Sequence, residues 1–113
     1  MSVSFDLSRV NCIAILTPAP GKKERTQQVL SEVLVANVEK NEPDTLLYQF
    51  WWIEDRNEFL FIESYKTIET LTAHMQTSYF KQCIEAIEKE ELLAKPMELK
   101  LLKEPIAGFN RSG

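Results

Sequence analysis

The sequence has few of the residues from which metal, phosphate and disulfide sites are built. Its 113 residues include one histidine, two cysteines and three glycines, and the glycines do not form a phosphate-binding pattern. One histidine and two distant cysteines do not supply a standard zinc ligand set. We therefore expect no metal site. Nothing in the sequence indicates attachment of a nicotinamide, flavin or haem, so we also expect no cofactor.

Basic charge and long apolar runs are scarce as well. Lysine and arginine total 13 against 17 acidic residues, which gives a net charge of -4. Nucleic-acid binding requires a basic surface, so we expect no nucleic-acid partner. No apolar run is long enough to span a bilayer. Residues 1–6 lack the basic and apolar regions of a secretory signal, and we expect a cytoplasmic protein without membrane contact.

The two cysteines, Cys12 and Cys83, both lie inside apolar segments. Free cysteine in such a place behaves as a small hydrophobic residue. We expect two reduced thiols in an intracellular chain, and a disulfide between them remains the alternative.

The rest of the sequence fits one domain of strands and helices. Apolar runs predict strands over 10–16, 45–53 and 58–66, and a last strand that starts at Pro96. Helical spacing predicts a helix over 22–40, a second one through Met75 with Thr67 as its N-cap, and a third from residue 77 or 78. The order strand, helix, strand, strand, helix, strand is the ferredoxin-like α+β pattern with a four-stranded antiparallel sheet. We assign the domain to residues 10–103, after an N-terminal arm (1–9) and before a C-terminal tail (104–113).

Large apolar residues occupy both faces of the second and third predicted strands. Alternation sends successive side chains to opposite faces. In the second strand Leu47 and Trp51 lie opposite Tyr48, Phe50 and Trp52, and in the third strand Leu60 and Ile62 lie opposite Phe59, Phe61 and Tyr65. Two helices on one face leave the other face uncovered, and such patches usually mark association surfaces. We expect a homodimer that packs sheet face against sheet face. The alternative is that the terminal arms fold over the open face.

His74 is the first candidate for chemistry. It falls at the edge of the apolar stripe formed by Ile68, Leu71 and Met75, so its ring should face the gap between helix and sheet. A neutral imidazole in that gap can accept a proton from an acidic hydroxyl. The alternative is a helix-edge histidine bonded to a backbone carbonyl.

Glu63 is the second candidate, because a carboxylate in the middle of an apolar strand is seldom left unpaired. It either orients the imidazole, holds a substrate hydroxyl, or pairs with a basic residue. Several aromatic residues are candidates for binding a flat ligand, although aromatic residues in strands more often serve as core or interface. These are Tyr48, Trp51, Phe61, Tyr65, Tyr79 and Phe80.

Three segments resemble the antibiotic biosynthesis monooxygenase family, in its group of small quinol monooxygenase-like proteins. Residues 13–21 (IAILTPAPG) are similar to the family's first strand and its Pro-Gly exit. Residues 61–65 (FIESY) are similar to its third strand, with a Glu and an aromatic residue two positions later. Residues 71–80 (LTAHMQTSYF) are similar to its Ala-His helix and are the most specific of the three. The resemblance extends over residues 10–103.

The resemblance implies a dimeric α+β barrel with a pocket between the helices and sheet of each subunit. It also implies a cofactor-independent monooxygenase that oxidises a quinol or a related hydroxyaromatic with molecular oxygen. In such members the substrate is deprotonated, and its anion reduces oxygen directly. By this analogy His74 is the base or hydrogen-bond anchor, and Glu63 is its polar partner.

Other members of the family leave alternatives open. Haem-degrading members use an Asn, Trp and His set, and this sequence has Ala14, His74 and Ile84 at those places, which argues against haem. An isomerase of a small phosphorylated diketone shares the Glu, Tyr and His-bearing segment. A phosphorylated substrate requires convergent basic residues, for which Arg9, Arg56 and Lys66 are available.

Two further functions therefore remain open: an isomerase or tautomerase of a small carbonyl compound, and a non-catalytic ligand-binding module of a stress response. Oxygen consumption distinguishes the monooxygenase from both. Proton exchange next to a carbonyl supports the isomerase. Tight binding without turnover, unchanged in His74→Ala, supports the binding module.

Overall fold

The computed structural model of the chain describes residues 8–109 and 111. Its sheet has four strands in the order β2-β3-β1-β4, and every neighbouring pair is antiparallel. The strands are β1 (Val10–Leu16), β2 (Thr45–Ile53), β3 (Glu58–Tyr65) and β4 (Glu98–Leu102). The predicted ferredoxin-like α+β fold is confirmed.

The first helical region has a feature that the sequence pattern did not predict. The expected helix over 22–40 is present, but it consists of α1 (Lys23–Val29), a π-helical segment η1 (Leu30–Val35) and α2 (Ala36–Asn41). A π-helical turn widens the helix locally. No proline or glycine marks this segment in the sequence, so it carried no local signal.

The second helical region begins twice with a threonine cap. Thr67 caps α3 (Ile68–Met75) by accepting a bond from the Thr70 N–H at 3.3 Å, as predicted. Thr77 caps α4 (Ser78–Lys89) in the same way, with the Phe80 N–H at 3.2 Å. Each cap satisfies a backbone donor that the first helical turn leaves free. Between β2 and β3 the chain turns through η2 (Glu54–Arg56).

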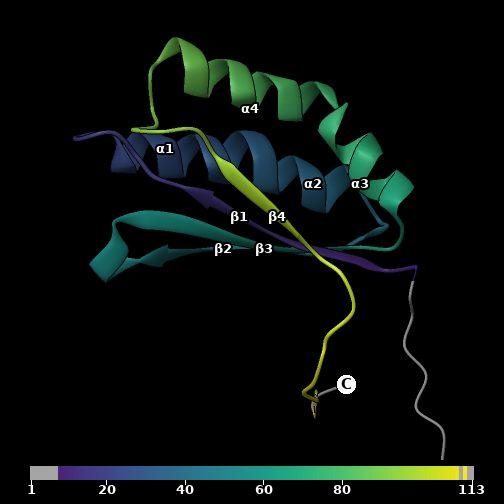
Figure 1. Cartoon of the computed structure of the whole chain (residues 1–113). Coiled ribbons are helices and arrows are strands. Elements are labelled where there is room, and N and C mark those ends of the chain that lie inside the picture. Colours follow the sequence, from purple (N-terminus) through teal and green to yellow (C-terminus); the bar gives the residue numbers. More distant parts are fainter. Residues whose placement is uncertain (1–7, 110, 112–113) are drawn as a thin grey trace, which may run out of the picture.

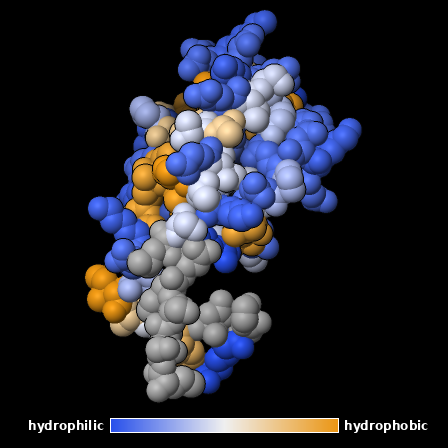
Figure 2. Space-filling view, turned by 90° about the vertical axis from the view of Figure 1, so that its right-hand side faces the viewer, coloured by the Kyte–Doolittle hydropathy of each residue, from blue (hydrophilic) through white to orange (hydrophobic). Residues whose placement is uncertain are grey.

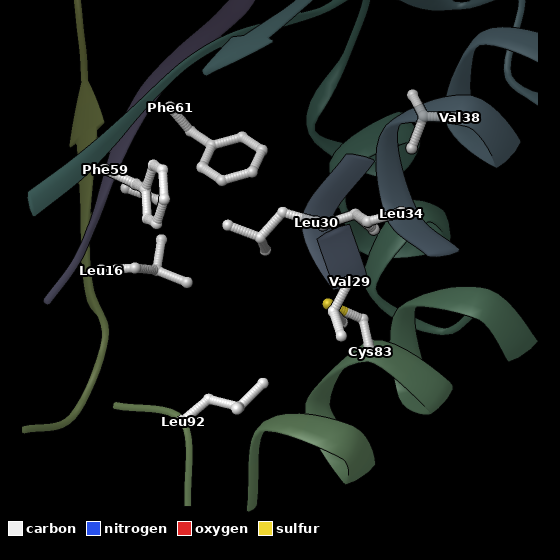
Figure 3. Packing of buried hydrophobic residues seen from close by; sticks show 10 residues of the cluster. Leu16, Val29, Leu30, Leu34, Val38, Phe59, Phe61, Cys83 and Leu92 are labelled. Carbon is white, nitrogen blue, oxygen red and sulfur yellow. The ribbon is translucent and has the colours of Figure 1, made fainter. Parts of the chain in front are cut away.

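All the helices lie on one side of the sheet (Figure 1). The core fills the space between the two layers, where strand residues such as Leu16, Phe59 and Phe61 point toward Leu30 and Cys83 of the helices (Figure 3). Both cysteines are buried free thiols, as expected. Burial raises the pKa of Cys12 to about 12 and that of Cys83 to about 11.

The strand register assigns each face of the sheet. Glu63 of β3 lies opposite Cys12 of β1 and Tyr48 of β2, so these three residues share the face that the helices cover. Trp51 lies opposite Leu60, and both belong to the other face, which we call the open face. The open face also carries Ile13, Ile15, Leu47 and Ile62.

The edge strand β4 and the segment after it are the least covered parts of the described chain. All five residues of β4 are exposed, and the strand begins at Glu98 rather than at Pro96. Leu99 and Leu101 share the helix-side face with β1 residues, yet they are 43% and 55% exposed. Beyond β4 the chain leaves the body of the domain (Figure 1), and Ile106 and Phe109 are also exposed. Figure 2 shows several separate apolar patches among mostly hydrophilic residues on the face that it presents.

Two further predictions concern the N-terminal arm and membrane contact. Of the expected N-terminal arm (1–9), residues 1–7 lie outside the described part of the chain. Within the described part, none of the helices has the length and apolar character that a bilayer crossing requires.

Candidate functional site

The helix α3 directs His74 at the sheet. Leu71 and His74 are three residues apart, so they share one face of this short helix, and both are buried. The His74 ring is 2% exposed and packs against the rings of Tyr48, Tyr65 and Phe80 at centroid distances of 5.2, 5.6 and 5.2 Å. The predicted position in the gap between helix and sheet is thus where the structure has it.

Both nitrogens of the imidazole have polar partners. Nδ1 lies 3.0 Å from each carboxylate oxygen of Glu42, and Nε2 lies 3.3 Å from the Tyr48 hydroxyl. An ionised carboxylate only accepts hydrogen bonds, so the Nδ1 proton is the one that fits this pairing. Nε2 is then free to accept, and it faces the hydroxyl of Tyr48. Burial first, and then the nearby Glu63, raise the pKa of Tyr48 far above its usual range, so this hydroxyl keeps its proton.

Glu42 is the residue of this candidate site that the sequence analysis did not identify. It caps the C-terminal end of α2, immediately before Pro43. Its carboxylate also accepts bonds from the Thr45 hydroxyl at 2.8 Å and from the Tyr79 hydroxyl. Nothing in the spacing of Glu42 sets it apart from other acidic residues at helix ends, because its partner is 32 positions away.

Glu63 lies on the same covered face, next to the histidine site. It is 6% exposed, and its Oε1 accepts bonds from the Tyr65 hydroxyl at 2.5 Å and from the Cys12 thiol at 3.4 Å. Burial raises the pKa of Glu63, and these two bonds offset only part of the effect. Neither bond uses Oε2, and Glu63 lines the cavity described next.

A cavity of about 50 Å³ lies between the helices and the sheet. Tyr48, Glu63 and His74 are the lining residues that carry polar side-chain groups, apart from the Cys83 thiol. The remaining lining is apolar and comes from β1, β3, β4 and the helices: Ala14, Leu16, Leu30, Leu34, Phe61, Leu71, Met75, Phe80, Cys83, Ile84, Ile87, Met97 and Leu99. Convergent polar groups in a mostly apolar cavity are the usual composition of a small-molecule site.

The structure brings most of the predicted site residues together, but not all of them. Tyr48, Phe61, Glu63, His74 and Phe80 line the cavity, as listed above. Tyr65 contacts both Glu63 and the imidazole, and Tyr79 lies on the other side of the imidazole, on Glu42.

Trp51 is the exception among the predicted residues. It belongs to the open face and is 55% exposed, because side chains alternate along a strand and its neighbours in sequence take the covered face. The structure does not place it at the cavity.

The three basic residues considered for a phosphorylated substrate do not converge. Arg9 donates to the Ser64 hydroxyl at 2.7 Å, near the end of β3 where Lys66 follows. Arg56 lies in the turn before the same strand, 3.8 Å from Glu58. None of the three lines the cavity, and no lysine or arginine is among its lining residues. Within residues 8–109 and 111, no cluster of three or more His, Cys, Asp or Glu has the arrangement of a metal site.

Comparisons with known proteins agree with this fold. The sequence matches the model of the antibiotic biosynthesis monooxygenase family over residues 9–86. An uncharacterized protein of Synechocystis sp. is 36% identical over 85 residues, which are 74% of this chain. The chain spans about half (55%) of the length of that curated relative.

Solved structures show the same architecture. A candidate antibiotic biosynthesis monooxygenase from Caulobacter crescentus superposes with a TM-score of 0.78 at 22% identity, over 89% of this chain and 93% of that one. A candidate monooxygenase of the same kind from Nitrosomonas europaea gives 0.77 at 16% identity, over 92% and 97%. At these identities the likeness concerns the fold.

Proposed function

Because this chain belongs to the antibiotic biosynthesis monooxygenase family, we propose that it is a cofactor-independent monooxygenase of a small hydroxyaromatic, such as a quinol. One observation carries the proposal: His74, Tyr48 and Glu63 line one mostly apolar cavity, and the Tyr48 hydroxyl lies 3.3 Å from Nε2 of His74. A phenol bound there has its hydroxyl next to a base and its ring among apolar side chains.

In the proposed first step, the phenol displaces the Tyr48 hydroxyl, which lies 3.3 Å from Nε2 of His74, and Nε2 takes the phenolic proton. The imidazolium that forms is stabilised by Glu42, whose two oxygens lie 3.0 Å from Nδ1. The side chains of His74 and Glu42 are only 2% and 11% exposed, so this charge pairing is stronger than it is in solution. General-base assistance of this kind contributes roughly 10²–10⁴-fold to a rate.

In the second step the phenolate transfers one electron to molecular oxygen. The two radicals then combine, which forms a carbon–oxygen bond between a ring carbon and the oxygen molecule. The resulting peroxide takes the proton back from Nε2, and its O–O bond breaks as the ring C–H proton is lost. The ring gains a carbonyl oxygen, and the second oxygen atom leaves as water. The substrate itself is the reductant, so the atoms and electrons balance without another redox partner.

We assign Glu63 to the second polar group of the substrate. Because burial raises the pKa of Glu63, its carboxyl group is protonated more readily than a carboxyl group exposed to water. The protonated form can donate a hydrogen bond to a developing carbonyl. The donors Tyr65 and Cys12 hold its Oε1 in place, as described above. The carboxyl therefore presents a fixed partner to the substrate without free rotation.

The cavity must widen to accept an aromatic ring. A volume of about 50 Å³ suits a few water molecules, by the usual requirement of roughly 10–15 Å³ for each. Three lining residues are partly open to solvent: Met75 and Met97 at 37% and Leu99 at 43%. Leu99 belongs to β4 and Met97 lies just before it. The strand β4 is at the edge of the sheet and pairs with one neighbouring strand, β1. We propose that the ring enters by displacing these side chains.

Oxygen uptake by metal-stripped protein tests the proposal, with a panel of reduced naphthoquinols and hydroxyaromatics as substrates. His74→Ala serves as the control for autoxidation. Uptake above background that falls by about 100-fold or more in the variant supports the mechanism. Equal uptake in both proteins removes His74 from the mechanism, and no uptake from any compound contradicts the substrate class.

The same geometry also suits an isomerase of a small carbonyl compound, because two acid–base groups, His74 and Glu63, line one cavity. One group would remove a proton next to the carbonyl, and the other would return a proton at the oxygen or a neighbouring carbon. Deuterium exchange from solvent into a carbonyl panel, without oxygen uptake, would favour this function. The absence of basic side chains in the cavity lining argues against a phosphorylated version of the substrate.

We also propose that the protein is a homodimer through the open face. The helices cover the other face, while the open face presents Trp51, Ile62 and their aliphatic neighbours to solvent. Trp51 and Ile62 are 55% and 36% exposed, and a second copy of the same face removes both from water.

A further inference from the structure

The imidazole of His74 separates two different hollows. On its Nε2 side is the apolar cavity. On its other side is a shallow surface depression whose lining includes Glu42, Asp44, Glu69 and Tyr79. His74 is the residue that lines both. The reaction cavity and the polar surface therefore meet at one ring.

On the surface side, Glu42 is held by more bonds than its pairing with His74 requires. Oε1 accepts from the Thr45 hydroxyl and Oε2 from the Tyr79 hydroxyl, while Nδ1 of His74 lies 3.0 Å from both oxygens. The Glu42 side chain is 11% exposed, so water does not replace these donors freely. Burial and the bond to Glu42 raise the pKa of Tyr79 to about 12, and its hydroxyl therefore remains a donor at neutral pH.

The donors on Glu42 come from three separate elements. Thr45 opens β2, where an irregularity in register between Thr45 and Leu47 interrupts the regular alternation. Tyr79 is in the first turn of α4, and His74 is near the end of α3. The Glu42 carboxylate thus links α3 and α4 to the edge strand β2, and its hydrogen-bond partners on these three elements fix its position.

We propose that Glu42 and Tyr79 are a positioning pair for His74: Glu42 keeps the proton on Nδ1, and Tyr79 holds Glu42 in the place from which it does so. Neutral histidine carries one ring proton, and in the other tautomer that proton occupies Nε2. Nε2 would then donate instead of accepting, and it could not take a proton from a hydroxyl in the cavity. The tautomer is a property of the resting protein, and only the kinetic part of the inference rests on the proposed function.

Ring-nitrogen NMR of full-length protein with labelled histidine tests the tautomer directly. His74 is the single histidine of the sequence, so its signals need no assignment. We expect wild-type protein to carry the proton on Nδ1. Glu42→Leu should transfer most of it to Nε2, the site that free neutral histidine prefers, and Glu42→Gln and Tyr79→Phe should give mixtures. Glu69→Gln is the matched control, since Glu69 lines the same depression but is not a partner of the ring.

The kinetic arm uses the substrate found by oxygen uptake. We expect kcat to fall roughly 30-fold in Glu42→Leu and roughly 3- to 10-fold in Tyr79→Phe, with KM changed less than about threefold. A purely structural role would instead lower the thermal midpoint and leave the tautomer and kcat unchanged.

A proton on Nε2 in wild-type protein, or the same tautomer in wild type and Glu42→Leu, overturns the inference. If Glu42→Leu does not fold, Glu42→Gln and Tyr79→Phe still decide it, because a loss of Nδ1 protonation in either supports the pair and none in both contradicts it. A chain that oxidises no substrate refutes the proposed function, while the tautomer measurement decides this inference separately.

Discussion

The same four strands form both faces of the sheet, yet the two faces differ in burial and in hydrogen bonding. On the covered face, Phe61 and Tyr65 are buried, and Oε1 of Glu63 is hydrogen-bonded. On the open face, Trp51 and Ile62 reach solvent. Side-chain alternation produces both faces from the same residues in sequence. The comparison places the candidate site on the covered face and the proposed dimer interface on the open face.

The largest expected effect concerns the covered face. Phe61 is 2% exposed, packs against Phe50 and Tyr48 and lines the cavity, so Phe61→Ala removes core packing and leaves a void. We expect a loss of about 3–5 kcal/mol in the free energy of unfolding, measured by urea denaturation.

The adjacent residue provides the matched control. Ile62→Ala changes the open face at the next position of β3. In a dimer, its cost should fall as protein is diluted, because association contributes to apparent stability, whereas the cost of Phe61→Ala should not depend on concentration. Equal dependence on concentration for both variants would contradict the assignment of the two faces.

The second prediction breaks the open face. Trp51→Glu places a charge in the middle of the proposed interface, where it loses water on association. We expect the dissociation constant of the dimer to rise by roughly 100-fold or more. Light scattering should then give the mass of one chain instead of the mass of two chains. The control is Ile68→Glu, since Ile68 is 47% exposed on α3, away from the open face. A monomeric wild type at micromolar concentration would refute the interface.

Most of the fold was predictable from local patterns. The strand β1 and the cap Thr67 stand where apolar runs and capping chemistry put them. Alternation also separated two residue sets within each strand, whereas the strand register was needed to show which sets share a face. The π-helical segment η1 was not predicted, because it depends on how α1 and α2 pack and no residue type marks it.

The site was predictable only where it was local in sequence. Glu63 and Tyr65 are two residues apart on one strand, and their pairing follows from the alternation itself. Glu42 was missed because its relation to His74 exists only after three elements have packed. Trp51 was assigned to the site because aromatic composition does not tell one face from the other. A shift of one residue in the strand register moves Trp51 to the other face of the sheet, and the register is fixed only when the strands pair in the folded protein.

The smallest expected effect is a pH dependence that separates a buried carboxyl from an exposed one. Burial raises the pKa of Glu63 above its ordinary value of 4.5. As pH rises past that value, the unfolded chain loses this proton before the folded chain does, so folded stability declines until the folded pKa is passed. Glu63→Gln lacks this loss. The stability of wild type relative to Glu63→Gln should therefore be highest at about pH 4 and decrease toward about pH 8.

Glu90 gives the opposite sign and completes the test. Its hydrogen bond with Arg25 on the surface lowers the pKa of Glu90, so its contribution is present above 4.5 and is lost as pH falls. Relative to Glu90→Gln, wild type should be slightly more stable at neutral than at acidic pH. Urea unfolding of the three proteins across this pH range measures both differences, and groups that titrate alike in all three cancel. The same sign for both variants would mean that Glu63 is not buried as its hydrogen bonds and exposure indicate, and the cavity would lose its second polar group.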